Sequence, residues 1–86
     1  MVKRRVTIVS EVGLHARPAA AFAKAAAAVP LAVTIRKDGK DPVDAASVLG
    51  LMTLGAEHGD EVVLAADGAG ADAALDQLAA VLATAE

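Results

Sequence analysis

The alanine-rich segment at residues 16–29 constrains the fold more than any other part of the chain. Its apolar side chains recur three and four residues apart, the spacing of one helix face, at Ala19, Phe22, Ala23, Ala26 and Val29. Pro18 falls in the first turn, where a missing N–H is harmless, and Pro30 stops a helix. We therefore predict a helix over residues 16–29.

Short runs of alternating apolar residues predict strands on both sides of this helix. They lie at residues 3–9, 31–36, 41–43 and 62–66. The polar, glycine-containing residues 37–40 indicate a hairpin between the second and third of these strands. Pro42 makes the third strand a short one and suits it to a sheet edge.

Two further helices are predicted in the second half of the chain. Residues 48–54 are mostly apolar, follow Ser47 as a side-chain cap and end at Gly55, so one or two helical turns are expected. A second long helix is predicted from a stripe at Ala71, Leu75, Leu78 and Leu82.

The predicted element order is β-α-β-β-α-β-α. Each strand is apolar mainly on one side, which favours an antiparallel sheet that carries its helices on a single face. The expected fold is α+β, an open-faced sandwich of a four-stranded antiparallel sheet and three helices. With 86 residues, the chain is expected to form a single domain over residues 1–86.

Composition excludes several classes of function. There is no cysteine, so disulfides, thiolate chemistry and metal sites of the Cys/His type are excluded, and we expect no metal ion and no cofactor. No apolar run approaches the roughly 18 residues needed to cross a bilayer, and no leader opens the chain. A cytoplasmic protein without a membrane partner is expected.

Charge is divided unevenly along the chain. All eight Lys and Arg residues lie within residues 1–40, whereas residues 41–86 hold nine acids and no base. The bases are scattered, and no Trp or Tyr lies among them, so a nucleic-acid partner is not expected. Positive charge near residues 15–17 favours partners that deliver or take an anion.

The segment Gly13-Leu14-His15-Ala16-Arg17-Pro18 carries the chemistry. A neutral imidazole nitrogen is nucleophilic near neutral pH, and His15 stands where the long helix is expected to begin. The unpaired N–H groups of a helix start and the guanidinium of Arg17 disfavour the imidazolium form. After transfer, the same groups stabilise an attached phosphoryl group. The pattern therefore predicts a phosphoryl acceptor rather than an inert surface histidine.

On this segment the chain resembles the HPr family, the histidine-containing phosphocarriers of the bacterial phosphoenolpyruvate-dependent sugar phosphotransferase system. The resemblance continues through Phe22 and Ala23, residues 47–55 and residues 59–62. It implies that enzyme I phosphorylates Nδ1 of His15 and that IIA domains of sugar permeases take the group. It also implies that Ala16, Arg17 and Pro18 bind the phosphoryl group, in a monomeric stoichiometric carrier that is not an enzyme.

The short apolar helix predicts a docking surface. Leu51 and Leu54 can face the sheet together, but the other apolar side chains of so short a helix cannot all follow them inward. The family resemblance implies that these side chains and two positions of the long helix contact partners. The candidate residues are Ala20, Lys24, Val48, Leu49 and Met52.

Ser47 has two interpretations. In the first, it is simply the cap of the short helix. In the second, which the resemblance implies, it matches the serine that an ATP-dependent HPr kinase phosphorylates in some lineages, and this phosphorylation makes the carrier a partner for a transcription regulator. Two other functions also stay open at this point. One is that of a paralogue that serves nitrogen or regulatory phosphotransfer. The other is that of a binding adaptor that uses Val48, Leu49 and Met52 without phosphorylation of His15.

Overall fold

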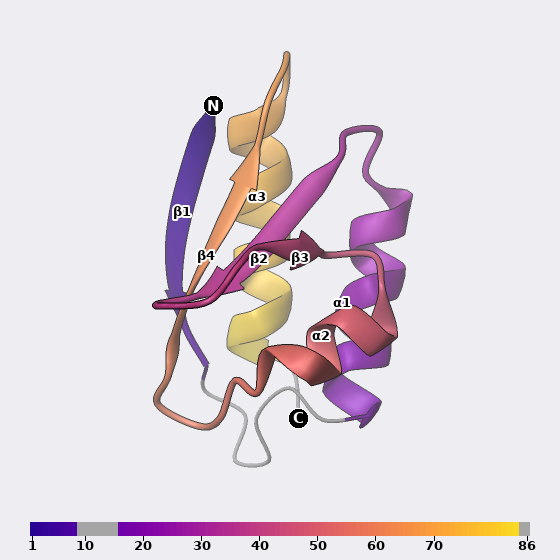
Figure 1. Cartoon of the computed structure of the whole chain (residues 1–86). Coiled ribbons are helices and arrows are strands. Elements are labelled where there is room, and N and C mark those ends of the chain that lie inside the picture. The colour runs from indigo at the N-terminus through magenta and orange to yellow at the C-terminus, as the bar shows by residue number, and fades with distance from the viewer. Residues whose placement is uncertain (9–15, 85–86) are drawn as a thin grey trace.

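The computed structural model describes residues 1–8 and 16–84 and has the predicted element order (Figure 1). Its strands are β1 (Val2–Thr7), β2 (Val33–Lys37), β3 (Val43–Asp44) and β4 (Glu61–Ala66). Its helices are α1 (Ala16–Ala28), α2 (Val48–Leu54) and α3 (Ala71–Thr84). The order β-α-β-β-α-β-α is thereby confirmed.

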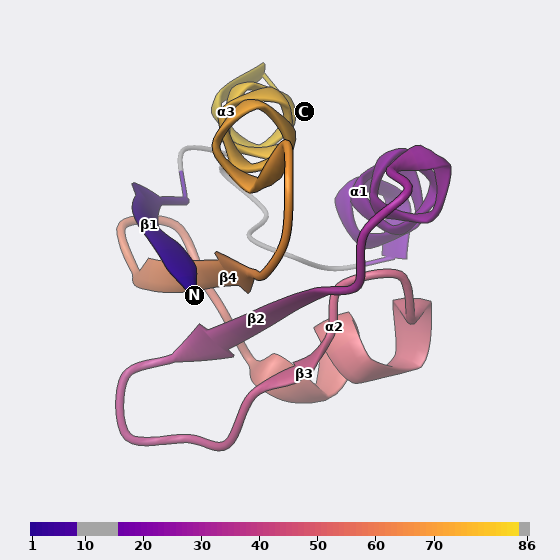
Figure 2. The same ribbon diagram turned by 90° about the horizontal axis from the view of Figure 1, so that it is seen from above.

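The four strands form one antiparallel sheet in the order β1-β4-β2-β3. Seen from above, all three helices lie on the same side of this sheet (Figure 2). The helix α3 covers β1 and β4, and α1 lies between α3 and α2. The predicted open-faced sandwich is therefore confirmed, and within residues 1–8 and 16–84 the opposite face of the sheet carries no helix.

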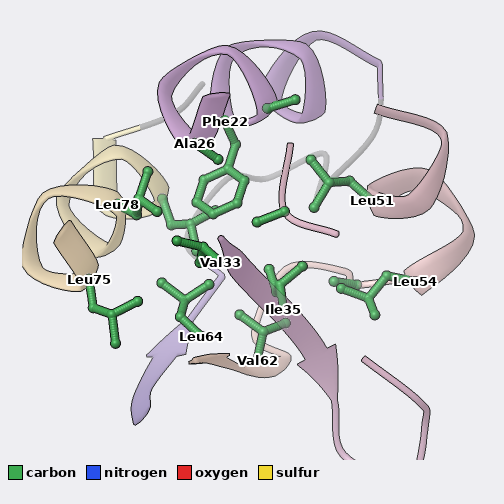
Figure 3. Packing of buried hydrophobic residues seen from close by; sticks show 14 of the residues in the cluster. Phe22, Ala26, Val33, Ile35, Leu51, Leu54, Val62, Leu64, Leu75 and Leu78 are labelled. Carbon is green, nitrogen blue, oxygen red and sulfur yellow. The ribbon is translucent and has the colours of Figure 1, made fainter. Parts of the chain in front are cut away.

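The helices and the sheet share a single apolar core (Figure 3). Phe22 of α1, Leu51 of α2 and Leu78 of α3 are fully buried and point into the space that the helices and the sheet enclose. Ile35 of β2 and Leu64 of β4 meet them from the sheet. The three- and four-residue spacing that predicted α1 and α3 thus corresponds to their buried faces.

The caps predicted for α2 are present. The Ser47 Oγ accepts a hydrogen bond from the Gly50 backbone N–H at 3.0 Å, as an N-cap does. Gly55 ends the helix with φ of 71°, a left-handed conformation that favours glycine. These two residues fix the length of α2 at seven residues.

Several predicted boundaries were wrong. The short third strand covers residues 43–44 rather than 41–43, because the ladder pairs only Val43 with Ile35 and Asp44 with Thr34. Pro42 precedes this ladder and has no N–H to donate to it. The first strand ends at Thr7 rather than residue 9, although the Ile8 N–H still donates to the Asp60 carbonyl at 2.8 Å.

Helix and strand ends elsewhere also differ from prediction by a few residues. The strand β2 begins at Val33 rather than residue 31, and α1 ends at Ala28. The helix α3 continues past Leu82 to Thr84. In the described part of the chain, no helix combines the length and apolar character needed to cross a membrane.

Candidate functional site

The helix α1 begins at Ala16, the residue that follows His15 in the chain. This confirms the predicted helix start. His15 itself, with Gly13 and Leu14, lies outside the described residues. The first turn of α1 holds no acidic residue, so no carboxylate of its own neutralises the positive end of the helix dipole.

Arg17 is exposed in this first turn. Its guanidinium therefore stands in solvent at the end of the helix where unpaired backbone N–H groups gather. A helix start combined with an exposed arginine favours anion binding, because both groups present donors to the same kind of ligand. Of the predicted phosphate-binding residues, Ala16 and Pro18 belong to the same turn.

The predicted docking residues are exposed on two helices that pack against each other, α1 and α2. Ala20 and Lys24 contribute from α1. On α2, Leu49 is 76% exposed, Met52 44% and Val48 38%. We call these five residues the α1–α2 surface. The predicted division of α2 is confirmed, because Leu51 and Leu54 of the same helix are buried.

Exposure of three large apolar side chains on a seven-residue helix is costly in water. Among the described residues, the other large hydrophobic side chain this exposed is Met1, at the N-terminus. Apolar residues gathered in this way are typical of a protein-binding surface. Met52 adds an unbranched, adaptable thioether, which suits a surface that has to fit more than one partner.

A polar network that the sequence did not predict holds the end of α2. Lys37 Nζ donates to the Gly55 carbonyl at 3.2 Å and lies 3.0 Å from Asp60 Oδ2. The same Asp60 oxygen accepts a hydrogen bond from the Glu57 backbone N–H at 2.9 Å. The Glu57 N–H and Lys37 lower the pKa of the Asp60 carboxyl.

This network lies next to the strand end that leads to His15. The Gly59 N–H donates to the Ile8 carbonyl at 2.9 Å, and Ile8 in turn donates to the Asp60 carbonyl. The segment between α2 and β4 is therefore linked through Lys37 to the end of α2 and hydrogen-bonded directly to Ile8, the residue after β1. Lys37 and Asp60 are far apart in sequence, so no local pattern could have paired them.

The other histidine and the candidate regulatory serine have different settings. His58 is exposed in the turn before β4. Ser47 is half-buried, and its hydroxyl oxygen already caps α2. The capping role predicted for Ser47 is thereby confirmed.

Comparison with known proteins agrees with this arrangement. The family profile described as "PTS HPr component phosphorylation site" matches residues 2–84. The chain belongs to the HPr family. The phosphocarrier protein HPr of Streptomyces coelicolor is 51% identical over 83 residues, which cover 96% of this chain and 89% of the relative.

Solved and curated relatives extend the match. A crystal structure of HPr from Bacillus anthracis superposes with a TM-score of 0.86 at 39% identity, over 93% of this chain and 94% of that one. The HPr-like protein Crh of Bacillus subtilis is 44% identical, over 93% of each chain. As an HPr-family member, the protein is a phosphocarrier of the phosphoenolpyruvate-dependent sugar phosphotransferase system and not a catalyst.

Proposed function

We propose that the protein accepts a phosphoryl group from phospho-enzyme I on Nδ1 of His15 and passes it to IIA domains of sugar permeases. The observation that carries this proposal is the start of α1 at Ala16, directly after His15 in an HPr-family chain. A carrier that works between enzyme I and IIA domains would act in the cytoplasm.

The chemistry follows from the helix start. The Nδ1 lone pair attacks phosphorus while the bond to the donor breaks and its electrons stay with the donor. The neutral ring is favoured beforehand, since the helix start and Arg17 both repel a cation. Afterwards, the backbone N–H groups of Ala16 and Arg17 and the Arg17 guanidinium hold the phosphoryl oxygens, and Pro18 keeps the turn rigid.

The α1–α2 surface is the proposed docking site for both enzyme I and the IIA domains. Val48, Leu49 and Met52 supply apolar area on α2, and Lys24 adds an exposed positive charge on the neighbouring helix α1. A partner that covers this surface lies against the helix that begins beside His15. Because one surface serves donor and acceptor, the carrier has to release the first before it binds the second.

A regulatory role is the second candidate, and the match to Crh favours it. Ser47 is half-buried at the start of α2, where an added phosphate would meet the helix N-terminus. An HPr kinase would modify Ser47, and a transcription regulator would then bind. A paralogue of nitrogen or regulatory phosphotransfer would show itself by the acceptor it serves, and an adaptor by partner binding through Val48, Leu49 and Met52 with no phosphohistidine detectable.

The test is reconstitution with enzyme I, Mg²⁺ and phosphoenolpyruvate, followed by intact-mass measurement. We expect one added phosphoryl group, labile in acid and stable in base. His15→Ala should abolish the addition, whereas His58→Ala, the matched removal of the other histidine, should keep it. Phosphorylation that persists in His15→Ala would overturn the proposal.

A further inference from the structure

The sheet face that carries no helix contains an apolar strip. On β4, Val62, Leu64 and Ala66 face the core, yet Val63 on the opposite face is only 6% exposed and Ala65 is half-buried. Residues opposite each other in neighbouring strands share a face. The open face is therefore not uniformly polar along β4.

Cations on the neighbouring strands lie beside this strip. In the register of the sheet, Val63 lies between Arg5 of β1 and Arg36 of β2. Ala65 lies between Lys3 of β1 and Thr34 of β2. Val63 therefore has a cation on both neighbouring strands, whereas Ala65 has one on β1 only.

The acidic residues nearby do not balance all of this charge. Arg5 is 3.1 Å from carboxylate oxygens of both Asp38 and Glu61. The Arg36 Nη1 atom is 3.7 Å from Asp38 Oδ1, and the same carboxylate also forms an ion pair with Arg5. Lys3 forms no ion pair with any described residue. Asp44 also lies on this face, opposite Thr34, but among the described residues it forms no ion pair with Lys3 or Arg36. Lys3 is therefore left without a carboxylate partner in the described part of the chain, and Arg36 shares one with Arg5.

A hollow of about 250 Å³ lies between these two cations. Its floor is Val63 and Ala65, and Met1 and Pro42 stand beside it. None of the described residues that line it is acidic. The small side chain of Ala65, flanked by longer ones, accounts for the depression.

The size of the hollow decides what kind of ligand it suits. Pockets for small molecules occupy roughly 300–1,000 Å³ and bury most of the ligand. This hollow is smaller and open to solvent, so it fits one inserted side chain better than an entire ligand. The rest of the binding area would come from the surface around it, as in a protein interface.

We propose that this hollow, which we call the open-face site, docks a partner protein through an apolar side chain flanked by carboxylates. The apolar side chain rests on Val63 and Ala65, and the carboxylates pair with Lys3 and Arg36. The site lies on the face of the sheet opposite the helices. A partner bound there leaves α1 and α2 free, so it can stay on the carrier during phosphoryl transfer.

The probe is the peptide acetyl-Gly-Asp-Leu-Asp-Gly-amide, titrated into the ¹⁵N-labelled full chain. We expect saturable shifts of the Lys3, Arg36 and Ala65 amide signals. A peptide with Asn in place of both Asp, and one with Ser in place of Leu, should bind more weakly. Lys3→Gln should weaken binding by about two- to five-fold, the effect of one surface charge pair.

Matched controls separate this site from the proposed phosphoryl-transfer function. Lys24→Gln removes the same charge from α1 and should leave the peptide affinity unchanged. Lys3→Gln should still accept phosphate from enzyme I at the normal rate, whatever the outcome at the open face. No saturable shift, or equal binding of the Asn peptide, overturns the proposal. Binding of free hexanoate as tightly as the peptide overturns it too, in favour of a small-anion site.

Discussion

Leu49 and Leu54 are identical residues in one short helix with opposite exposure, 76% and 2%, and truncating each should separate docking from stability. Burying a leucine side chain contributes roughly 1.5–3 kcal/mol. About three quarters of Leu49 is available to a partner, and alanine keeps only one of its four side-chain carbons. Leu49→Ala should therefore weaken docking by about 0.8–1.7 kcal/mol, which is about 4- to 20-fold.

Leu54→Ala should instead lower the free energy of unfolding by roughly 2–5 kcal/mol, because it opens a cavity in the core. Leu49→Ala should change that free energy by less than about 0.5 kcal/mol. The assay is steady-state phosphorylation by enzyme I, with urea unfolding followed in parallel. Leu49→Ala should raise KM with kcat unchanged, since docking is uniform binding. A KM of Leu49→Ala for enzyme I equal to that of the wild type would refute the assignment of α2 as the docking helix.

Three further outcomes follow from the structure. Arg17→Ala should slow phosphoryl transfer through kcat while urea unfolding stays as in the wild type, because Arg17 is exposed and its proposed role is to hold the transferred group; equal kcat values would exclude its role. Gly55→Ala should cost about 1–2 kcal/mol in urea unfolding, because φ is 71° there although the added Cβ meets nothing closer than 3.6 Å. Asp60→Asn should remove a stabilisation that depends on the charged carboxylate. That stabilisation is complete above the ordinary aspartate pKa of about 4 and is lost as the pH falls through the lowered pKa of Asp60 in the folded protein. The melting temperatures of variant and wild type should therefore converge on acidification, and a constant difference down to low pH would contradict this.

The helices were predictable because their signals are local. The spacing of Phe22 and Ala26 lies within α1, and the stop at Pro30 comes two residues after its end. Ser47 caps α2 through the nearby Gly50 N–H, and Gly55 ends it by its own left-handed conformation. The exposure of Leu49 and Met52 followed from the burial of Leu51 and Leu54, because a seven-residue helix has one buried face.

Features that depend on pairing between distant segments were not predictable in the same way. The two-residue length of β3 depends on which residues of β2 remain free to pair with Val43 and Asp44. The contact of Lys37 with Asp60 requires β2 to lie beside the turn before β4. The burial of Val63 on the open face could not be predicted from β4 alone, because only the sheet order brings Arg5 and Arg36 alongside it. His15 was identified by its sequence neighbours, and its own position lies outside the described residues.

The most direct measurement is ³¹P and ¹⁵N NMR of the protein labelled in its two histidines and phosphorylated by enzyme I and phosphoenolpyruvate. Coupling between phosphorus and Nδ1 of His15, lost when a IIA domain is added, is the predicted result. A phosphoryl group on Nε2, on His58 or on a hydroxyl oxygen, or one that no IIA domain removes, would contradict the account.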